Sequence, residues 1–293
     1  MALPKFEYLA PKSIGEACAA LAANPEAKLI AGGQSLLRVM KFRIMSPECL
    51  VDLKSIPGLR YVEHESDTLR IGALATQTDV LRDRVVIKEF PVLFEAIARI
   101  ANTAVRNSAT VVGNICVGHT ASDPSAALLA LDAELLVVST SGERVLPIAE
   151  LFVGHMTTAL EPSDVVKEIR IPRPKSACGM AYLAHAGRGA METPLIAAGA
   201  VLTTDGKKCV AARIALAGAA DTPIRLKRAE KALVGRVLGD ELIQTAASIA
   251  SEDCTPDSDV YASSEYRRRL VAVYVRDVLR SASKRIDERD WEK

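Results

Sequence analysis

The chain has 293 residues, 49% of them hydrophobic, a length that predicts two or three domains with sizeable cores. It carries 37 lysines and arginines against 36 aspartates and glutamates, a net charge of +1, with one tryptophan and five phenylalanines. Nucleic-acid binding needs basic surfaces and aromatic platforms for bases, so this composition argues against a nucleic-acid partner. No apolar stretch approaches the roughly 20 residues that span a bilayer, so no transmembrane segment is expected.

The six cysteines are scattered, and no two are close in sequence. This spacing matches neither zinc nor iron–sulfur ligation nor a disulfide framework. The N-terminus also lacks the pattern of a secretion signal, so we expect a reduced, cytoplasmic protein. The four histidines are not paired at metal-ligand spacing, and no metal site is predicted.

Residues 1–57 predict a small α/β unit, termed lobe 1. Ser13 and Glu16 are spaced as a capping box, which predicts a helix that ends near Ala23. Residues 29–31 and 49–53 are expected to form short buried strands. A pair of glycines, Gly32 and Gly33, follows the first of these strands.

Residues 58–175 predict a larger unit, termed lobe 2. Its expected elements are a strand at 69–73, a helix capped by Thr76, a helix within 90–101, a hairpin at 134–146 and a strand at 165–171. A second glycine turn, around Gly113, lies between the helices. Asp123 and Pro124 then begin another helix, because Asp favours the cap position and Pro the first turn.

Residues 176–293 predict a separate C-terminal domain after a linker that contains Pro172 and Pro174. Strands are expected at 180–185, 195–203 and 209–216, and helices at 226–234, 239–252 and 264–284. The fold class is therefore α+β, and this domain is expected to combine a three-stranded antiparallel sheet with a three-helix bundle.

The two glycine turns are the most informative feature of the sequence. Glycine permits a positive φ and a close approach to the backbone, and successive backbone amides in such turns bind anions. Each turn by itself is typical of an ordinary loop. The P-loop pattern is absent, and the run from Gly187 lacks the third glycine of a Rossmann fingerprint. Two such turns that face one another would hold a diphosphate from both sides.

The order and spacing of these motifs resemble the FAD-binding medium subunit of the xanthine oxidase family of molybdenum hydroxylases, above all the separate subunits of aerobic carbon monoxide dehydrogenases and bacterial heterocycle hydroxylases. The similarity extends over nearly the whole chain. It rests on Ala31-Gly32-Gly33-Gln34-Ser35, Met40-Lys41, Leu50-Val51-Asp52-Leu53, Ile71-Gly72-Ala73, Thr76, Val105-Arg106-Asn107, Thr110-Val111-Val112-Gly113-Asn114, Asp123-Pro124, Ile169-Arg170-Ile171-Pro172 and Glu265-Tyr266-Arg267.

The resemblance implies a two-lobed FAD-binding domain, like that of vanillyl-alcohol oxidase (the PCMH fold), with FAD between lobe 1 and lobe 2. It assigns the first phosphate cradle to Leu29, Ile30, Ala31, Gly32, Gly33, Gln34, Ser35 and Leu36. It assigns the second to Ile100, Ala101, Thr110, Gly113 and Asn114. Ser122 and Asp123 match positions on the adenosine side, and Val166 matches an apolar position near the ring system.

Three points of this assignment stay open. Ser122 and Asp123 serve equally well as helix caps. Many relatives have a second glycine where this chain has Val112, which weakens the second turn. Relatives also often place an aromatic residue near 188–195 to shield the flavin, but this chain has Glu192 and Thr193 there. Tyr182 is then the nearest substitute, although a tyrosine in a strand is more often a core residue.

The resemblance further implies an oxidoreductase subunit that takes electrons from the [2Fe–2S] clusters of a small subunit and passes them from FAD to an external acceptor. A large molybdopterin subunit would complete a heterotrimer, present twice in the complex, with contact to the inner face of the membrane only through that complex. No side chain is expected to be catalytic. The alternatives are a free-standing FAD-dependent oxidase with its own substrate pocket and an assembly module that has lost flavin.

Overall fold

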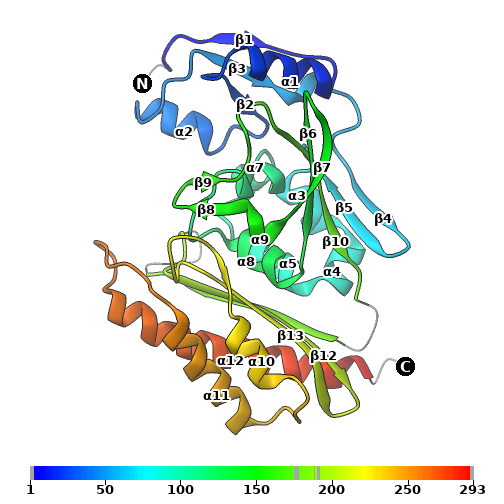
Figure 1. Ribbon diagram of the computed structural model, residues 1–293, viewed down its shortest axis with the longest axis vertical. Coiled ribbons are helices and arrows are strands. Elements are labelled where there is room, and N and C mark those ends of the chain that lie inside the picture. Colours follow the sequence, from blue (N-terminus) through cyan, green and yellow to red (C-terminus); the bar gives the residue numbers. More distant parts are fainter. Residues whose placement is uncertain (1–2, 175–177, 188, 190–191, 291–293) are drawn as a thin grey trace.

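The computed structural model describes residues 3–174, 178–187, 189 and 192–290. Figure 1 shows three parts stacked along the long axis, with lobe 1 at one end, lobe 2 in the middle and the C-terminal domain at the other end. The predicted boundary near residue 57 remains a prediction, and the boundary at 175 and 176 lies outside the described residues.

Lobe 1 is a three-stranded parallel sheet flanked by two helices. The Ser13 hydroxyl accepts a hydrogen bond from the backbone N–H of Glu16, as predicted. The Glu16 carboxylate accepts from the backbone N–H of Lys12 and not from that of Ser13, so the capping box is incomplete. The first strand was not predicted, because it is only three residues long. The elements are β1 (Glu7–Leu9), α1 (Ile14–Ala23), β2 (Lys28–Ile30), α2 (Leu36–Lys41), β3 (Cys49–Asp52) and the 3-10 turn η1 (Leu53–Ser55).

Lobe 2 is built on a five-stranded antiparallel sheet in the order β4-β5-β10-β6-β7, with helices packed against it. The strands are β4 (Val62–Glu65), β5 (Thr68–Gly72), β6 (Glu134–Ser139), β7 (Gly142–Pro147) and β10 (Val165–Pro172). The helices are α3 (Gln77–Arg82), α4 (Arg84–Glu89), α5 (Pro91–Ala98), α6 (Thr103–Arg106), α7 (Val111–Ile115), α8 (Asp123–Ala130) and α9 (Ile148–Leu151). A small hairpin, β8 (Phe152–Gly154) with β9 (Thr157–Thr158), was not predicted.

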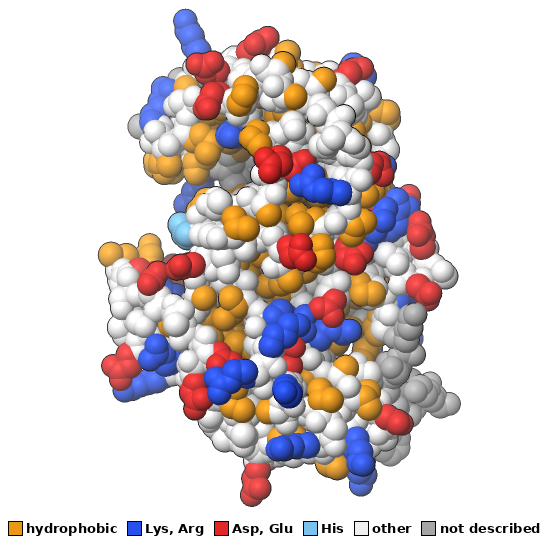
Figure 2. All heavy atoms as spheres, viewed as in Figure 1, with side chains coloured by type: hydrophobic (Ala, Val, Ile, Leu, Met, Phe, Trp, Pro, Cys, Tyr) orange, Lys and Arg blue, Asp and Glu red, His pale blue; other side chains and the backbone are white. Residues whose placement is uncertain are grey.

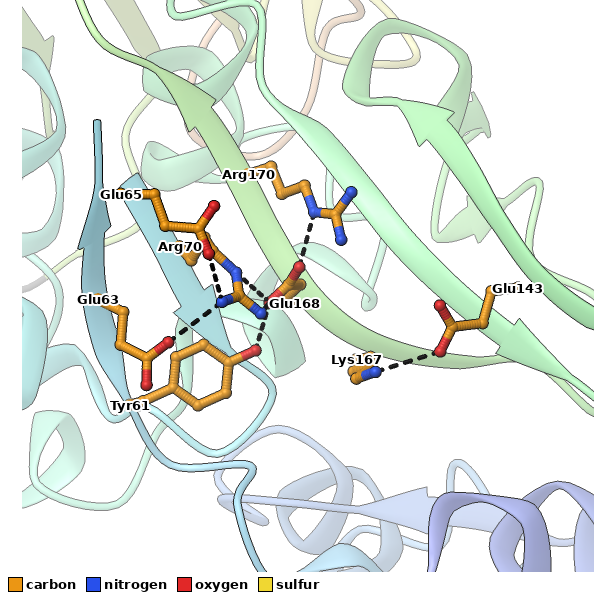
Figure 3. A network of polar contacts seen from close by, with 8 residues as sticks. All are labelled: Tyr61, Glu63, Glu65, Arg70, Glu143, Lys167, Glu168 and Arg170. Atoms are coloured by element: carbon orange, nitrogen blue, oxygen red, sulfur yellow. Dashed lines mark hydrogen bonds and ion pairs between the residues drawn. The ribbon is translucent and has the colours of Figure 1, made fainter. Parts of the chain in front are cut away.

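The buried carboxylate of Glu168 links strands β5 and β10 of this sheet (Figure 3). It pairs with Arg70 at 2.7 Å and Arg170 at 2.6 Å and accepts a hydrogen bond from the hydroxyl of Tyr61. Burial alone would raise the pKa of Glu168, but the hydrogen bonds from Arg70, Tyr61 and Arg170 outweigh it, and the pKa is lowered. Removal of one member of such a buried network leaves charges uncompensated.

The C-terminal domain has the predicted three long strands, but its sheet contains a short fourth strand that corrects the three-stranded prediction. The fourth strand has only two residues, which are too few for a periodic pattern to predict a strand. The strands are β11 (Cys178–His185), β12 (Ile196–Asp205), β13 (Lys208–Ala217) and β14 (Ile224–Arg225). The three predicted helices are α10 (Lys227–Leu233), α11 (Asp240–Asp253) and α12 (Ser264–Asp290).

Lobe 2 and the C-terminal domain share one hydrophobic core. The cluster joins α5 and α8 of lobe 2 to side chains of β11, β12 and β13, while α10, α11 and α12 cover the other face of the sheet. Gly199 in β12 permits this close packing, because a Cβ there would lie 3.3 Å from the backbone oxygen of Ala126 in α8. The two parts therefore cannot shift against each other without disrupting the core.

Candidate functional site

The first glycine turn connects β2 to α2 and presents its backbone to solvent. Gly33 adopts φ +70°, the left-handed region that glycine enters without strain. Gly32 and Gly33 are half-buried, whereas Gln34 and Ser35 are exposed. Within the described residues, the backbone N–H groups of residues 32–35 donate to no other group. These amides are thus available to an anion.

The second glycine turn begins at Thr110, which caps α7. The Thr110 hydroxyl accepts a hydrogen bond from the Gly113 N–H at 3.0 Å, and the backbone N–H of Gln77 donates to the carbonyl of Ala109, the residue before Thr110. A Cβ on Gly113 would lie 2.6 Å from the Thr110 hydroxyl oxygen, so only glycine keeps this cap. Because the hydroxyl serves as the acceptor, its own O–H remains able to donate.

The two turns lie against each other, although about eighty residues separate them in the sequence. A Cβ on Gly32 would be 2.1 Å from the Ser108 carbonyl oxygen and 2.9 Å from the Ala109 α-carbon. A Cβ on Gly113 would reach the Ala31 side chain at 4.0 Å. Figure 2 shows that the molecular surface is hollowed at the left edge of the view, between lobe 1 and lobe 2.

The two turns differ in what they offer a ligand. The first has open amides, whereas the second uses most of its own: Gly113 donates to the Thr110 side chain and Asn114 donates to the Thr110 carbonyl. Of the two cradles suggested by sequence, the first is therefore the main source of backbone donors. The second contributes a hydroxyl and a close approach.

The turn at Ile100 and Ala101 is shaped by an arginine. Ala101 has φ +42°, which is uncommon for a residue with a side chain. The guanidinium of Arg106 donates to the Ile100 carbonyl at 2.7 Å and to the Ala101 carbonyl at 3.2 Å. Nothing local in the sequence indicates this role of Arg106, because the two carbonyl groups lie five and six residues before it.

Ser122 and Asp123 begin α8, and both side chains have partners inside the protein. The Ser122 hydroxyl donates to the Asn114 side-chain oxygen at 2.9 Å. Asp123, only 7% exposed, accepts from the Tyr182 hydroxyl at 2.6 Å and lies 3.0 Å from the Nε of Arg99. Burial raises the pKa of Asp123 to about 6, against the opposing effects of Tyr182 and Arg99. A contact between Asp123 and a ribose stays a prediction.

Tyr182 is a core residue, the alternative that the sequence left open. Its side chain is 5% exposed and packs in the shared core, and its contact with the flavin stays a prediction. Val166 in β10 is likewise buried in that core, and its contact with the ring system stays a prediction. The contacts of Arg99 with Asp123 and of Glu95 with Tyr182 were not predicted, because a single charged residue in or next to a helix is typical of an exposed position.

The described residues contain no disulfide, no candidate metal cluster and no helix that could span a membrane. The six cysteines form no disulfide, and no group of three or more His, Cys, Asp or Glu side chains could hold a metal ion in the described part of the chain. None of the helices described has the length and apolar character needed to cross a membrane.

Comparison with known proteins identifies the family. Residues 4–174 match the model for the FAD binding domain in molybdopterin dehydrogenase. The chain belongs to this family. Residues 181–282 match the CO dehydrogenase flavoprotein C-terminal domain. The family prediction, that of an FAD-binding medium subunit of the molybdenum hydroxylases, is thereby confirmed.

Individual relatives agree over the whole length of this medium subunit. The carbon monoxide dehydrogenase medium chain of Hydrogenophaga pseudoflava is 35% identical over 95% of this chain and 97% of its own. The nicotine 6-hydroxylase medium subunit of Paenarthrobacter nicotinovorans is 32% identical, over 97% and 100%. Among solved structures, the carbon monoxide dehydrogenase from Hydrogenophaga pseudoflava that lacks the Mo-pyranopterin moiety matches with a TM-score of 0.94 at 36% identity, covering 97% of this chain and 99% of the other. Quinoline 2-oxidoreductase from Pseudomonas putida 86 matches with a TM-score of 0.91 at 33% identity, over 97% and 99%.

The residues of the two turns fit FAD. A diphosphate needs several donors in a confined space, and the open amides of residues 32–35 lie beside the second turn with its Thr110 hydroxyl. Gly32 has no room for a side chain at that junction. Amides and hydroxyls bind phosphate oxygens without a cationic side chain.

Proposed function

We propose that this medium subunit is the part of a multi-subunit molybdenum hydroxylase through which electrons leave the complex. The partners are a small subunit with two [2Fe–2S] clusters and a large molybdopterin subunit, in a dimer of heterotrimers. The complex is cytoplasmic and touches the inner face of the membrane only peripherally. Relatives named as medium chains and subunits of carbon monoxide, nicotine and xanthine dehydrogenases or hydroxylases support this proposal.

When bound, FAD would supply the redox chemistry, because a flavin can exchange electrons one at a time or in pairs. The protein's task is to hold and orient it. The N–H groups of residues 32–35 donate to the diphosphate, and the Thr110 hydroxyl adds a donor from the opposite lobe. Ile100 and Ala101 complete the wall, with their carbonyl oxygens already occupied by Arg106. No side chain of this chain acts as a general acid or base.

The observation that carries the proposal is the contact between the two turns at Gly32 and Ser108. At this point the two lobes meet through backbone atoms next to open amides, an arrangement suited to a chain of two phosphates. A free-standing oxidase would instead need convergent polar side chains for its own substrate, and the relatives named as subunits argue against that alternative.

The test compares two aspartate substitutions at glycines with similar backbone angles. Gly33 (φ +70°) lies in the first turn, and Gly58 (φ +73°) has no atom within 4 Å of an added Cβ. In Gly33→Asp, the carboxylate lies beside the diphosphate, so we expect FAD affinity to fall at least about 100-fold in a fluorescence titration. Gly58→Asp carries the same backbone strain and should bind FAD almost as the unsubstituted chain does.

Equal FAD affinity in the two variants would remove the first turn from the site. Purification from the host checks the assembly: FAD with two co-purifying subunits, one of which carries molybdopterin, supports the proposal. A yellow monomer that oxidises a substrate unaided would support the free-standing oxidase, and a chain unable to take up FAD would support the assembly module.

A further inference from the structure

Tyr182 is held by lobe 2 at both its backbone and its side chain, although it belongs to the C-terminal domain. It lies in β11, the edge strand of that domain's sheet. Its hydroxyl donates to Asp123 at 2.6 Å, and its backbone N–H donates to the Glu95 carboxylate at 2.8 Å. Both acceptors are carboxylates of lobe 2, on α8 and α5 respectively.

The Asp123 carboxylate is fixed between two partners. In the described part of the chain, the titratable or charged side chains that face it are Tyr182 from β11 and Arg99 from the end of α5. Hydrogen bonds to an ionised group are shorter and stronger than neutral ones. Since Asp123 is buried, the loss of one partner is not compensated by water.

A continuous set of contacts leads from Asp123 to the second glycine turn. Ser122, the adjacent residue, donates its hydroxyl to the Asn114 side chain, and Asn114 follows Gly113 in α7. Every residue of α8 is buried, so the start of this helix cannot move independently of the shared core. The position of Tyr182 is thereby linked to the geometry of the turn, although its own ring is buried in the shared core.

We propose that Tyr182 is a positioning residue of the FAD site, which acts by holding Asp123 and, through Ser122 and Asn114, the second glycine turn. This inference rests on the proposed function, because it takes that turn as part of the FAD site. It makes FAD affinity depend on a residue of the C-terminal domain that does not touch the cofactor.

The hydroxyl can be removed without separating the two parts of the protein. Glu95 also pairs with Arg285 of α12 at 2.5 Å, and Arg285 donates to the Met180 carbonyl. The backbone N–H of Tyr182 keeps its bond to Glu95 in any substitution other than proline. Together with the shared core, these contacts keep β11 in place when only the hydroxyl is lost.

The experiment measures FAD dissociation constants of the full chain from pH 5 to pH 8 for Tyr182→Phe. The matched control is Tyr61→Phe, which also removes a tyrosine hydroxyl from a buried carboxylate, that of Glu168, but does not contact Asp123. We expect Tyr182→Phe to bind FAD about tenfold more weakly near neutral pH.

We also expect a change in the pH profile. Without the hydroxyl, Asp123 takes up its proton at a higher pH, so the fall in FAD affinity on acidification begins at a higher pH than in the unsubstituted chain. Tyr61→Phe should leave the profile unchanged. The inference is overturned if Tyr182→Phe binds like Tyr61→Phe, or if it is weakened equally at all pH values. If the unsubstituted chain binds no FAD, the proposed function itself has failed.

Discussion

The contact between the two glycine turns leads to a prediction that one methyl group can test. Gly32→Ala would place a Cβ 2.1 Å from the Ser108 carbonyl oxygen and 2.9 Å from the Ala109 α-carbon. Ordinary contacts between such atoms are about 3.4 Å or longer, so the turns must separate by roughly 1 Å. Both obstructing atoms belong to the backbone, and no side-chain rotation relieves the overlap.

The size of the effect follows from the bonds that this separation lengthens. Overpacking of this kind costs about 1–3 kcal/mol of folding free energy. Loss of one or two hydrogen bonds to a charged phosphate costs about 3 kcal/mol of binding, which corresponds to roughly 100-fold weaker FAD binding. Ile30, Met40 and Leu50 form a small core within lobe 1, so we expect the fold to survive.

The assay is an FAD titration together with urea unfolding, with Gly15→Ala as the control. Gly15 lies in α1 of the same lobe, and its added Cβ would meet no atom closer than 4.0 Å. This control should bind FAD normally and gain about 0.5–1 kcal/mol of stability. If Gly32→Ala keeps FAD affinity within threefold of the unsubstituted chain, the two turns need not touch for binding, and the reasoning fails.

Two further predictions concern buried carboxylates. Glu168→Gln should lower the free energy of unfolding by about 3 kcal/mol, because Arg70 and Arg170 lose their counter-charge, and a urea titration that shows no loss would contradict the network's role. For Asp123, the pKa of about 6 in the folded protein exceeds the ordinary value of 3.8, so the folded state binds more protons between those values. The free energy of unfolding of the FAD-free chain, compared with that of Asp123→Asn, should therefore rise by up to about 3 kcal/mol as pH falls from 7 to 4. If the free energies of unfolding of the two chains changed in parallel with pH, the raised pKa of Asp123 would be refuted.

Most elements were predictable because their signals are local. The Thr76 cap, the helix start at Asp123-Pro124 and the hairpin at 134–146 depend on neighbouring residues, and the structure confirms the cap, the hairpin and the position of the helix. The predicted cap role of Asp123 is wrong, because Ser122 is the N-cap residue and Asp123 is the first residue of the helix. The missed strands β1, β4, β8, β9 and β14 have two to four residues each, too few for a period to show. The resemblance to the family came from the order of these local signals.

By itself, the sequence determined the three parts, the two glycine turns and the family. Only the tertiary structure decided that Gly32 abuts Ser108, that the second turn uses its own amides, and that the Tyr182 hydroxyl donates to Asp123. The reason is physical. Propensity, capping and turn chemistry act over a few residues, whereas the contacts of Gly32 with Ser108 and of Tyr182 with Asp123 join residues 59 or more positions apart, which only the packing of the folded chain brings together.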